Sequence, residues 1–250
     1  IVKKKIVFFS GSRAEYHIQE PILRKIQKNQ FFKTYFIISG SHISKSFGES
    51  FNIIKNNKIN IYKKINLKIT SNLKNGQIDY IFNLQKKISK ILLKIKPDFI
   101  FLTSDRFETL SVAIVAHILK IPIIHLEGGD VTEGGTLDDN SRHAITKLAS
   151  LHLVTNIDSK KRVLRLGEEQ SRVLNVGFPP LSNIDKKKLL KKNQIEKKLN
   201  FKLDNNLNIF TYHPVPGELK KENIIFKAIS VLSKKNYKFI ITYPNFDYGY

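Results

Sequence analysis

Short apolar runs of strand length alternate with helix-like segments along most of this chain. Runs such as Ile6–Phe9 are apolar at every position, which is typical of strands buried on both faces of a sheet. The segments between them space apolar residues as a helix does, most clearly from Gln77 to Lys96, where Pro97 follows. Because this alternation implies right-handed crossovers, it predicts an α/β fold with a Rossmann-type parallel sheet. The predicted strands lie in 4–12, 34–41, 98–104, 121–129, 151–155 and 172–180, and the predicted helices in 20–29, 77–96, 106–120, 139–150 and 158–168.

The character of the sequence changes after Pro180. Residues 1–180 make up the predicted N-terminal Rossmann-like domain, and residues 181–204 are polar and lysine-rich, which indicates a basic linker with helical character. Residues 205–250 carry one strand–helix–strand pattern, too short for a core of its own. We interpret it as the first βαβ unit of a second, nucleotide-binding domain. Because the chain contains no Met and stops just after a strand pattern, we expect it to be truncated within that domain.

The net charge of +22 raises the question of a nucleic-acid partner. The lysines are spread along the chain among Asn and Ile, so compositional bias explains the charge better. The absence of Cys excludes disulfides and thiolate metal sites. No apolar run approaches the roughly 18–20 residues of a membrane span, and no signal-peptide layout is present. We therefore expect a cytoplasmic protein that binds neither nucleic acid nor a membrane.

Polar residues follow five of the predicted strands. In a parallel sheet the carboxyl ends of the strands share one edge, and ligands bind there. We therefore expect one ligand site that draws on several of these segments. They are Gly11-Ser12-Arg13, Ser39 to His42, Ser104-Asp105-Arg106, Glu127-Gly128-Gly129 and Tyr212-His213-Pro214.

The turn after the first strand lacks the G-x-G-x-x-G spacing of dinucleotide-binding folds, because no second glycine follows Gly11 two residues on. A glycine turn before a helix still suits an anion, since helix N-termini offer free N–H groups. Arg13 adds a guanidinium for a phosphate. The alternative is an ordinary strand–helix turn with a surface arginine.

Acidic residues end two of the strands. Asp105 is either the N-cap of the next helix or a catalytic carboxylate. Two glycines follow Glu127, so this residue has no obvious capping role. Further along, either Asp138 or Asp139 could cap a helix, which leaves the other to face a ligand.

Arg142 and His143 are predicted in the first turn of that same helix. A cation is unfavourable at this position unless an anion binds nearby. His213 is either structural or a group at the mouth of the second domain. No histidine pairing suits a metal, and no G-x-S-x-G elbow indicates a serine hydrolase.

Several segments resemble the UDP-N-acetylglucosamine 2-epimerase family, and most closely its hydrolysing branch. They are "GSRAEY", "SDRFETL", "IPIIHLEGGDVTEGGTLDDNSRHAITKLASLHLVTN", "RVLRLGEE", "VGFPPL" and "YHPV". The resemblance covers nearly the whole chain apart from Phe47–Lys74 and the basic linker. It implies a glycosyltransferase-B-like fold of two Rossmann-type domains, with a nucleotide sugar between them and no cofactor. It also implies a homodimer or homotetramer for the full-length protein.

The resemblance further implies that UDP-GlcNAc is converted to N-acetylmannosamine and UDP, by elimination of UDP and addition of water. On this basis the acids of the 125–147 stretch face a sugar diphosphate, and its glycines let the backbone approach that ligand. The implied catalytic residues are Asp105, Glu127, Asp138 and His213. The implied substrate contacts are Gly11, Arg13, His42, Arg106, Asp139, Arg142 and His143.

Four other functions stay open from the sequence. The same reaction on a 2,4-diacetamido-trideoxy sugar nucleotide differs only in substrate, and a non-hydrolysing epimerase releases UDP-ManNAc. A glycosyltransferase on the same fold requires an acceptor, and a nucleic-acid binder requires salt-sensitive binding. Because members of that family are longer, the resemblance also implies that the 250-residue chain alone is inactive.

Overall fold

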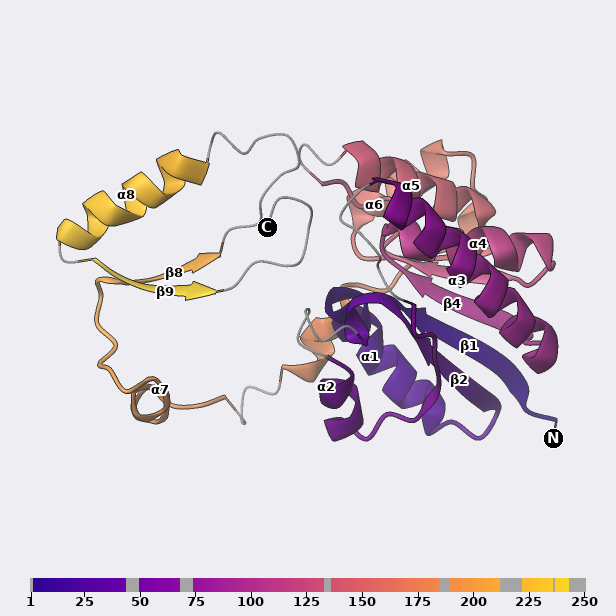
Figure 1. Cartoon of the computed structure of the whole chain (residues 1–250), viewed down its shortest axis with the longest axis horizontal. Coiled ribbons are helices and arrows are strands. Elements are labelled where there is room, and N and C mark those ends of the chain that lie inside the picture. Colours follow the sequence, from indigo (N-terminus) through magenta and orange to yellow (C-terminus); the bar gives the residue numbers. More distant parts are fainter. Residues whose placement is uncertain are drawn as a thin grey trace. The chain divides into compact units, whose positions relative to one another are not determined.

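The computed structural model describes residues 2–43, 50–67, 74–132, 136–184, 189–211, 222–235 and 237–242. The chain divides into two compact units, Ile1–Ile184 and Asp185–Tyr250 (Figure 1). The division falls close to Pro180, after which the composition of the sequence changes.

Unit 1 is built on a seven-stranded sheet in the order β3-β2-β1-β4-β5-β6-β7, and every neighbouring pair is parallel. The strand order reverses between β1 and β4, so a topological switch point lies between their carboxyl ends. The strands are β1 (Lys4–Ser10), β2 (Phe32–Ile38), β3 (Ile61–Lys64), β4 (Phe99–Thr103), β5 (Ile123–Leu126), β6 (Leu151–Val154) and β7 (Val173–Asn175). The α-helices of the unit are α1 (Arg13–Gln27), α2 (Phe51–Asn56), α3 (Lys74–Ile95), α4 (Phe107–Ile118), α5 (Thr136–Leu148) and α6 (Ile157–Arg165).

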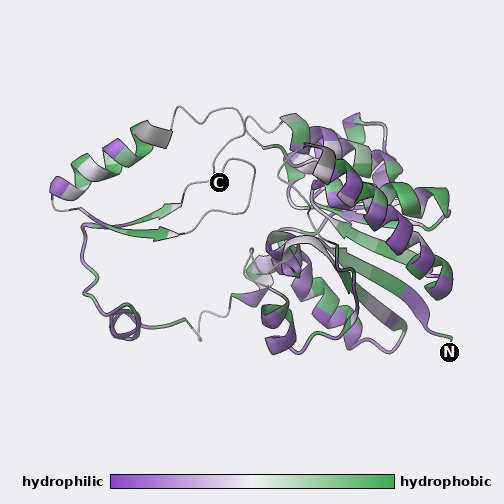
Figure 2. Cartoon of the chain, viewed as in Figure 1, coloured by the Kyte–Doolittle hydropathy of each residue, from purple (hydrophilic) through white to green (hydrophobic). Residues whose placement is uncertain are grey.

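Alternate side chains of each central strand enter different cores, as a strand repeat of two requires. In β1, Val7 and Phe9 pack with α3, α4 and α5, whereas Ile6 and Phe8 pack with α1 and α2. Both faces of the strand are therefore apolar, which explains its unbroken hydrophobic run. Figure 2 shows the central strands largely in green and the helices mixed in colour.

Helix α1 begins earlier than the sequence pattern indicated. It starts at Arg13 because Ser12 is its N-cap and forms a capping box with Glu15. Pro21 was expected near the start of this helix but lies inside it. The weakly patterned stretch after residue 47 contributes α2 and β3, which the sequence did not predict.

Unit 2 contains α7 (Lys192–Leu199), β8 (Leu207–Thr211), α8 (Glu222–Lys234) and β9 (Lys238–Thr242). Strands β8 and β9 pair in parallel, so the segment has the predicted strand–helix–strand order. Its role as the start of a nucleotide-binding domain stays a prediction.

Candidate active site

Arg142 joins the carboxyl ends of β4 and β5 to the start of α5. Its Nη2 pairs with Asp105 Oδ2, and its Nη1 donates to the backbone oxygen of Glu127 at 3.2 Å. Nη2 also lies 3.4 Å from Thr132 Oγ1, and Nε lies 3.9 Å from Asp139 Oδ1. The side chain is only 6% exposed, so these contacts form a desolvated clamp.

Glu127 is a buried carboxylate at the end of β5, with 7% of its surface exposed. Burial raises the pKa of Glu127 to about 7, and the charges of Asp130 and Asp105 add to this effect. Arg142 and a hydrogen bond from Ser104 oppose it. A carboxyl group with this pKa can both accept and release a proton near neutral pH, as general acid–base chemistry requires.

Glu127 and Ser104 share an uncommon backbone conformation. Their φ angles are +69° and +71°, in the left-handed region that non-glycine residues rarely adopt. The amide of Glu127 donates to Leu153 O at 3.0 Å, and that of Ser104 donates to Leu126 O at 3.0 Å. The sheet thus holds both strand ends in this conformation, which is characteristic of functional sites.

Asp105 is not a helix cap. Helix α4 begins at Phe107 and its N-cap is Arg106, so the capping interpretation of Asp105 is wrong. Asp105 instead accepts a hydrogen bond from Ser104 Oγ at 3.1 Å and forms an ion pair with Arg142.

Neither Asp138 nor Asp139 caps α5, which begins at Thr136, two residues before the first of them. The expectation of a cap is therefore wrong, and Arg142 and His143 lie beyond the first turn of the helix. The Asp-Asp-Asn-Ser run matched an N-cap signal but falls inside the helix.

The two aspartates differ in their surroundings. Asp139 accepts from the amide of Thr132 at 3.1 Å and lies beside Arg142. Asp138 is exposed, and its catalytic role stays a prediction. His143 is half-buried, and its Nδ1 has no hydrogen-bond partner within the described part of the chain.

Two backbone N–H groups of the turn at the end of β1 are already bonded within the protein. Glu15 Oε2 accepts the amides of Gly11 at 2.6 Å and Ser12 at 2.9 Å, so a carboxylate of the protein already takes the place of an external anion. The expectation of free amides is therefore wrong for Gly11 and Ser12, and an anion site at the start of α1 stays a prediction. Arg13 is exposed, and Arg106 pairs with Glu108 at 3.2 Å. Their predicted contacts with a diphosphate stay predictions.

His42 lies in a buried polar network rather than on the surface. Its Nε2 is 2.8 Å from Ser10 Oγ and its Nδ1 is 2.8 Å from Ser50 Oγ. Burial lowers the pKa of His42 to about 4, so the ring is neutral at physiological pH. A substrate contact by His42 would require this network to open.

Gly129 gives the acidic loop close packing against α6. A Cβ at this position would lie 2.3 Å from Ser159 O, and the φ of Gly129 is +80°. Close packing against α6 therefore requires a glycine here, and the expected approach of the backbone to a ligand stays a prediction. Gly134 and Gly135 of the same loop lie outside the described residues.

Two carboxylates of this edge have structural contacts that the sequence did not predict. Asp130 accepts from Thr155 Oγ1 at 2.7 Å and from Ser159 Oγ, which fixes the loop after β5. Glu15 anchors the turn before α1, and the Ser-x-x-Glu spacing of the capping box could have revealed it. No comparable local signal marks Asp130.

His213 lies outside the described residues, so its predicted role is not addressed by the structure. Within the described ranges, no group of three or more metal-ligating side chains is placed to hold a metal ion. No helix in those ranges has the length and apolarity needed to span a bilayer.

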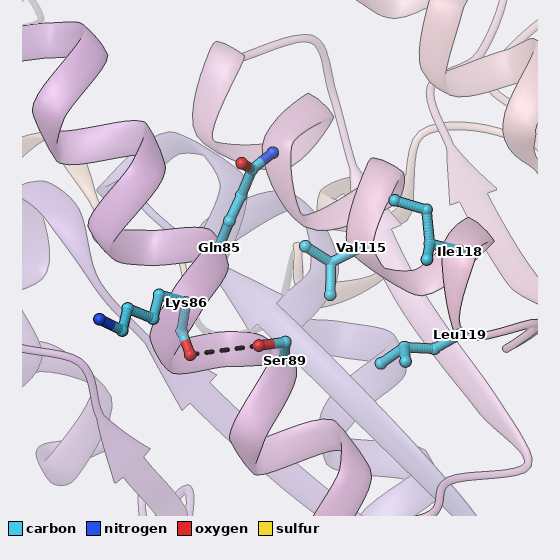
Figure 3. Close-up of a pocket in the computed structure, with 6 residues that line it drawn as sticks. All are labelled: Gln85, Lys86, Ser89, Val115, Ile118 and Leu119. Carbon is cyan, nitrogen blue, oxygen red and sulfur yellow. Dashed lines mark hydrogen bonds between the residues drawn. The ribbon is translucent and has the colours of Figure 1, made fainter.

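One pocket lies away from the strand ends, between α3 and α4 (Figure 3). It measures about 280 Å³, and its lining is mainly apolar. Its walls are Gln85, Lys86, Ser89, Val115, Ile118 and Leu119. A charged nucleotide sugar suits the polar strand ends better than this pocket.

The chain resembles two solved structures in fold. One is UDP-GlcNAc 2-epimerase from Neisseria meningitidis bound to UDP-GlcNAc, with a TM-score of 0.70 and 19% identity over 96% of this chain and 65% of that chain. Another is the S. aureus MnaA–UDP co-structure, with a TM-score of 0.79 and 19% identity over 98% and 63%. This likeness confirms the predicted α/β fold of the glycosyltransferase-B type.

Sequence relatives point the same way. A hydrolysing GDP/UDP-N,N'-diacetylbacillosamine 2-epimerase from Campylobacter jejuni is 35% identical over 98% of this chain and 64% of the relative. The UDP-N-acetylglucosamine 2-epimerase of Neisseria meningitidis is 28% identical over 98% and 64%. The chain thus spans a little under two thirds of the length of these relatives. The family model described as UDP-N-acetylglucosamine 2-epimerase matches residues 24–249. The acid-lined edge therefore lies in a member of the UDP-N-acetylglucosamine 2-epimerase family.

Proposed function

We propose that the complete protein is a hydrolysing nucleotide-sugar 2-epimerase, which converts UDP-GlcNAc to N-acetylmannosamine and UDP in nonulosonate (sialic-acid-type) biosynthesis. The observation that carries the proposal is the buried guanidinium of Arg142, which pairs with the carboxylate of Asp105 and donates to the backbone oxygen of Glu127. A relative from Escherichia coli, polysialic acid biosynthesis protein P7, is 29% identical over 98% of this chain.

The chemistry explains why two different acids are needed. No carbonyl activates the hydrogen at C2 of the sugar, so a base alone cannot remove it. When the C1–O bond breaks, its electron pair leaves with UDP, and the positive charge at C1 acidifies the C2 hydrogen. Asp105 stabilises that charge, as a carboxylate does in glycoside hydrolysis.

Glu127 suits the proton transfer because its pKa is raised to about 7. It takes the C2 proton, and the electrons of the C2–H bond form the double bond of a glycal. Water then adds its hydroxyl at C1 while a proton returns to C2 from the opposite face. Asp138 orients that water, and Arg13 and His213 neutralise the leaving diphosphate.

A second substrate is also supported. The relative from Campylobacter jejuni, at 35% identity, is named for N,N'-diacetylbacillosamine, a diacetamido sugar, and so is a relative from Legionella pneumophila at 29%. The relative named for UDP-GlcNAc is 28% identical. The comparison favours the diacetamido sugar nucleotide as the alternative substrate of the same reaction.

The test is incubation of the complete gene product with each sugar nucleotide in D₂O, followed by NMR of the products. We expect free 2-epimerised sugar, UDP and deuterium at C2. Release of UDP-linked epimer would instead indicate a non-hydrolysing epimerase. Product without deuterium at C2, or turnover only with an acceptor, would refute the proposal in favour of a glycosyltransferase.

Two further proposals concern the molecule as a whole. We expect the 250 residues alone to turn over neither substrate, since the relatives are about half as long again. We also expect the complete protein to be a cytoplasmic homodimer or homotetramer. Light scattering measures the oligomeric state directly.

A further inference from the structure

Glu15 fills the switch point between β1 and β4. The residue is 1% exposed, and its carboxylate lies between α1 on one face of the sheet and α4 on the other. Oε2 accepts the amides of Gly11 and Ser12, and Oε1 accepts the hydroxyl of Thr109 in α4. One side chain thus connects the turn before α1 to α4 across the end of the sheet.

A capping box alone does not explain these contacts. In a capping box the glutamate satisfies the amide of the N-cap residue, which is Ser12 here. Glu15 also binds the preceding amide of Gly11 and the distant Thr109, 94 residues along the chain. The additional bonds fix the position of the turn relative to α4.

The surroundings of Glu15 make this arrangement costly. Glu108 of α4 is also buried, Arg106 pairs with Glu108, and the hydroxyl of Tyr80 of α3 lies near both acids. Burial, followed by the charge of Glu108, raises the pKa of Glu15 to about 7. Burial of two carboxylates beside one guanidinium lowers the stability of the fold, so stability alone does not explain this arrangement.

The two segments that Glu15 connects carry residues of the proposed site. The turn leads directly into Arg13, and α4 follows directly on Asp105 and Arg106. We propose that Glu15 is a positioning residue, which sets the place of Arg13 relative to Asp105 by binding Gly11, Ser12 and Thr109. The inference rests on the proposed function, in which Arg13 binds the diphosphate and Asp105 faces C1 of the sugar.

Thr109 allows a test that leaves the carboxylate in place. In the complete protein, Thr109→Val removes the hydroxyl bonded to Glu15 without changing side-chain size, and Thr109→Ser retains the hydroxyl. The matched control is Thr103→Val, because the buried Thr103 hydroxyl has no partner in the described part of the chain. Misplacement of catalytic groups by about 1 Å can lower the rate by about 100-fold.

We expect Thr109→Val to lower kcat/KM by about tenfold to 100-fold, and Thr109→Ser and the control to stay within about threefold of wild type. In an Arg13→Gln background the effect of Thr109→Val should fall below about threefold, since coupled residues are not additive. If the bond is merely structural, Thr109→Val will lower the melting temperature, leave kcat/KM unchanged and show no coupling with Arg13→Gln. That result would overturn the inference.

Amide exchange of Gly11 and Ser12, measured by NMR, separates this inference from the proposed function. Glu15→Gln keeps an oxygen for both amides and can donate to Thr109, whereas Glu15→Ala cannot. Faster exchange in Glu15→Ala, restored in Glu15→Gln, supports the inference even if wild type turns over neither sugar nucleotide. Unchanged exchange in Glu15→Ala overturns it, whatever the activity of wild type.

Discussion

At the scale of single residues, Glu127 shows how a candidate site can lower the stability of the folded state. Its pKa rises from 4.5 to about 7 because burial and two neighbouring acids disfavour the charged form. Between these two pH values the unfolded chain loses this proton more readily than the folded chain. The contribution of protonated Glu127 to the free energy of unfolding is therefore fully present below about pH 4.5, and it is lost as the pH rises through 7.

Glu127→Gln removes this pH dependence. We expect the variant to exceed wild type in free energy of unfolding by roughly 3 kcal/mol at pH 8, and to equal it near pH 4. Urea denaturation at both pH values measures the difference. In an Asp130→Asn background the gain at pH 8 should shrink, because the charge of Asp130 contributes to the raised pKa. An equal gain at both pH values would contradict the explanation.

Residue identity and strand order predicted only part of this site. Asp105 and Glu127 follow predicted strands, so their placement at one edge followed from the parallel sheet. The Arg142 clamp did not follow, because it depends on where α5 begins and on a contact across 37 residues. The bond between Glu15 and Thr109 could not be predicted from the sequence either, since it joins residues 94 positions apart.

At the scale of elements, the loop between β5 and α5 depends on close packing against α6. Gly129 and Gly167 both have positive φ angles, +80° and +86°. A Cβ at Gly129 would meet the backbone oxygen of Ser159, whereas a Cβ at Gly167 would meet nothing within 4 Å. Substitution of Gly167 therefore tests backbone strain alone, whereas substitution of Gly129 tests backbone strain together with a steric clash.

We expect Gly167→Ala to cost about 1–2 kcal/mol through its left-handed backbone alone. Gly129→Ala should cost a further 1–3 kcal/mol or so, because α6 must move away from the loop. Chemical denaturation measures both, and the difference between them is the quantity of interest. Equal costs would show that the loop does not depend on this contact.

The elements themselves were predictable where apolar periodicity was strong. Helix α3 ends at Ile95, just before the Lys96-Pro97 pair, and β4 and β5 fall inside their predicted ranges. Helix starts were less predictable, because cap-like residues also occur inside helices, as Asp138 and Asp139 do in α5.

At the scale of the whole molecule, the two units differ in how much core they contain. Every buried apolar side chain in the described ranges lies between Ile6 and Val173, within unit 1. In unit 2 the described apolar residues include Ile209 of β8 and Ile224 and Phe226 of α8, all of them exposed. A strand–helix–strand unit of this size buries too little surface to offset its conformational entropy.

We therefore expect residues 1–184 to fold alone and residues 185–250 not to. The first fragment should unfold in one cooperative transition with a midpoint close to that of the 250-residue chain, because it contains the buried apolar core. The second should show no transition by circular dichroism and little dispersion in its NMR spectrum. A sharp transition from residues 185–250 would contradict this expectation, since it would require a core that their exposed side chains do not provide.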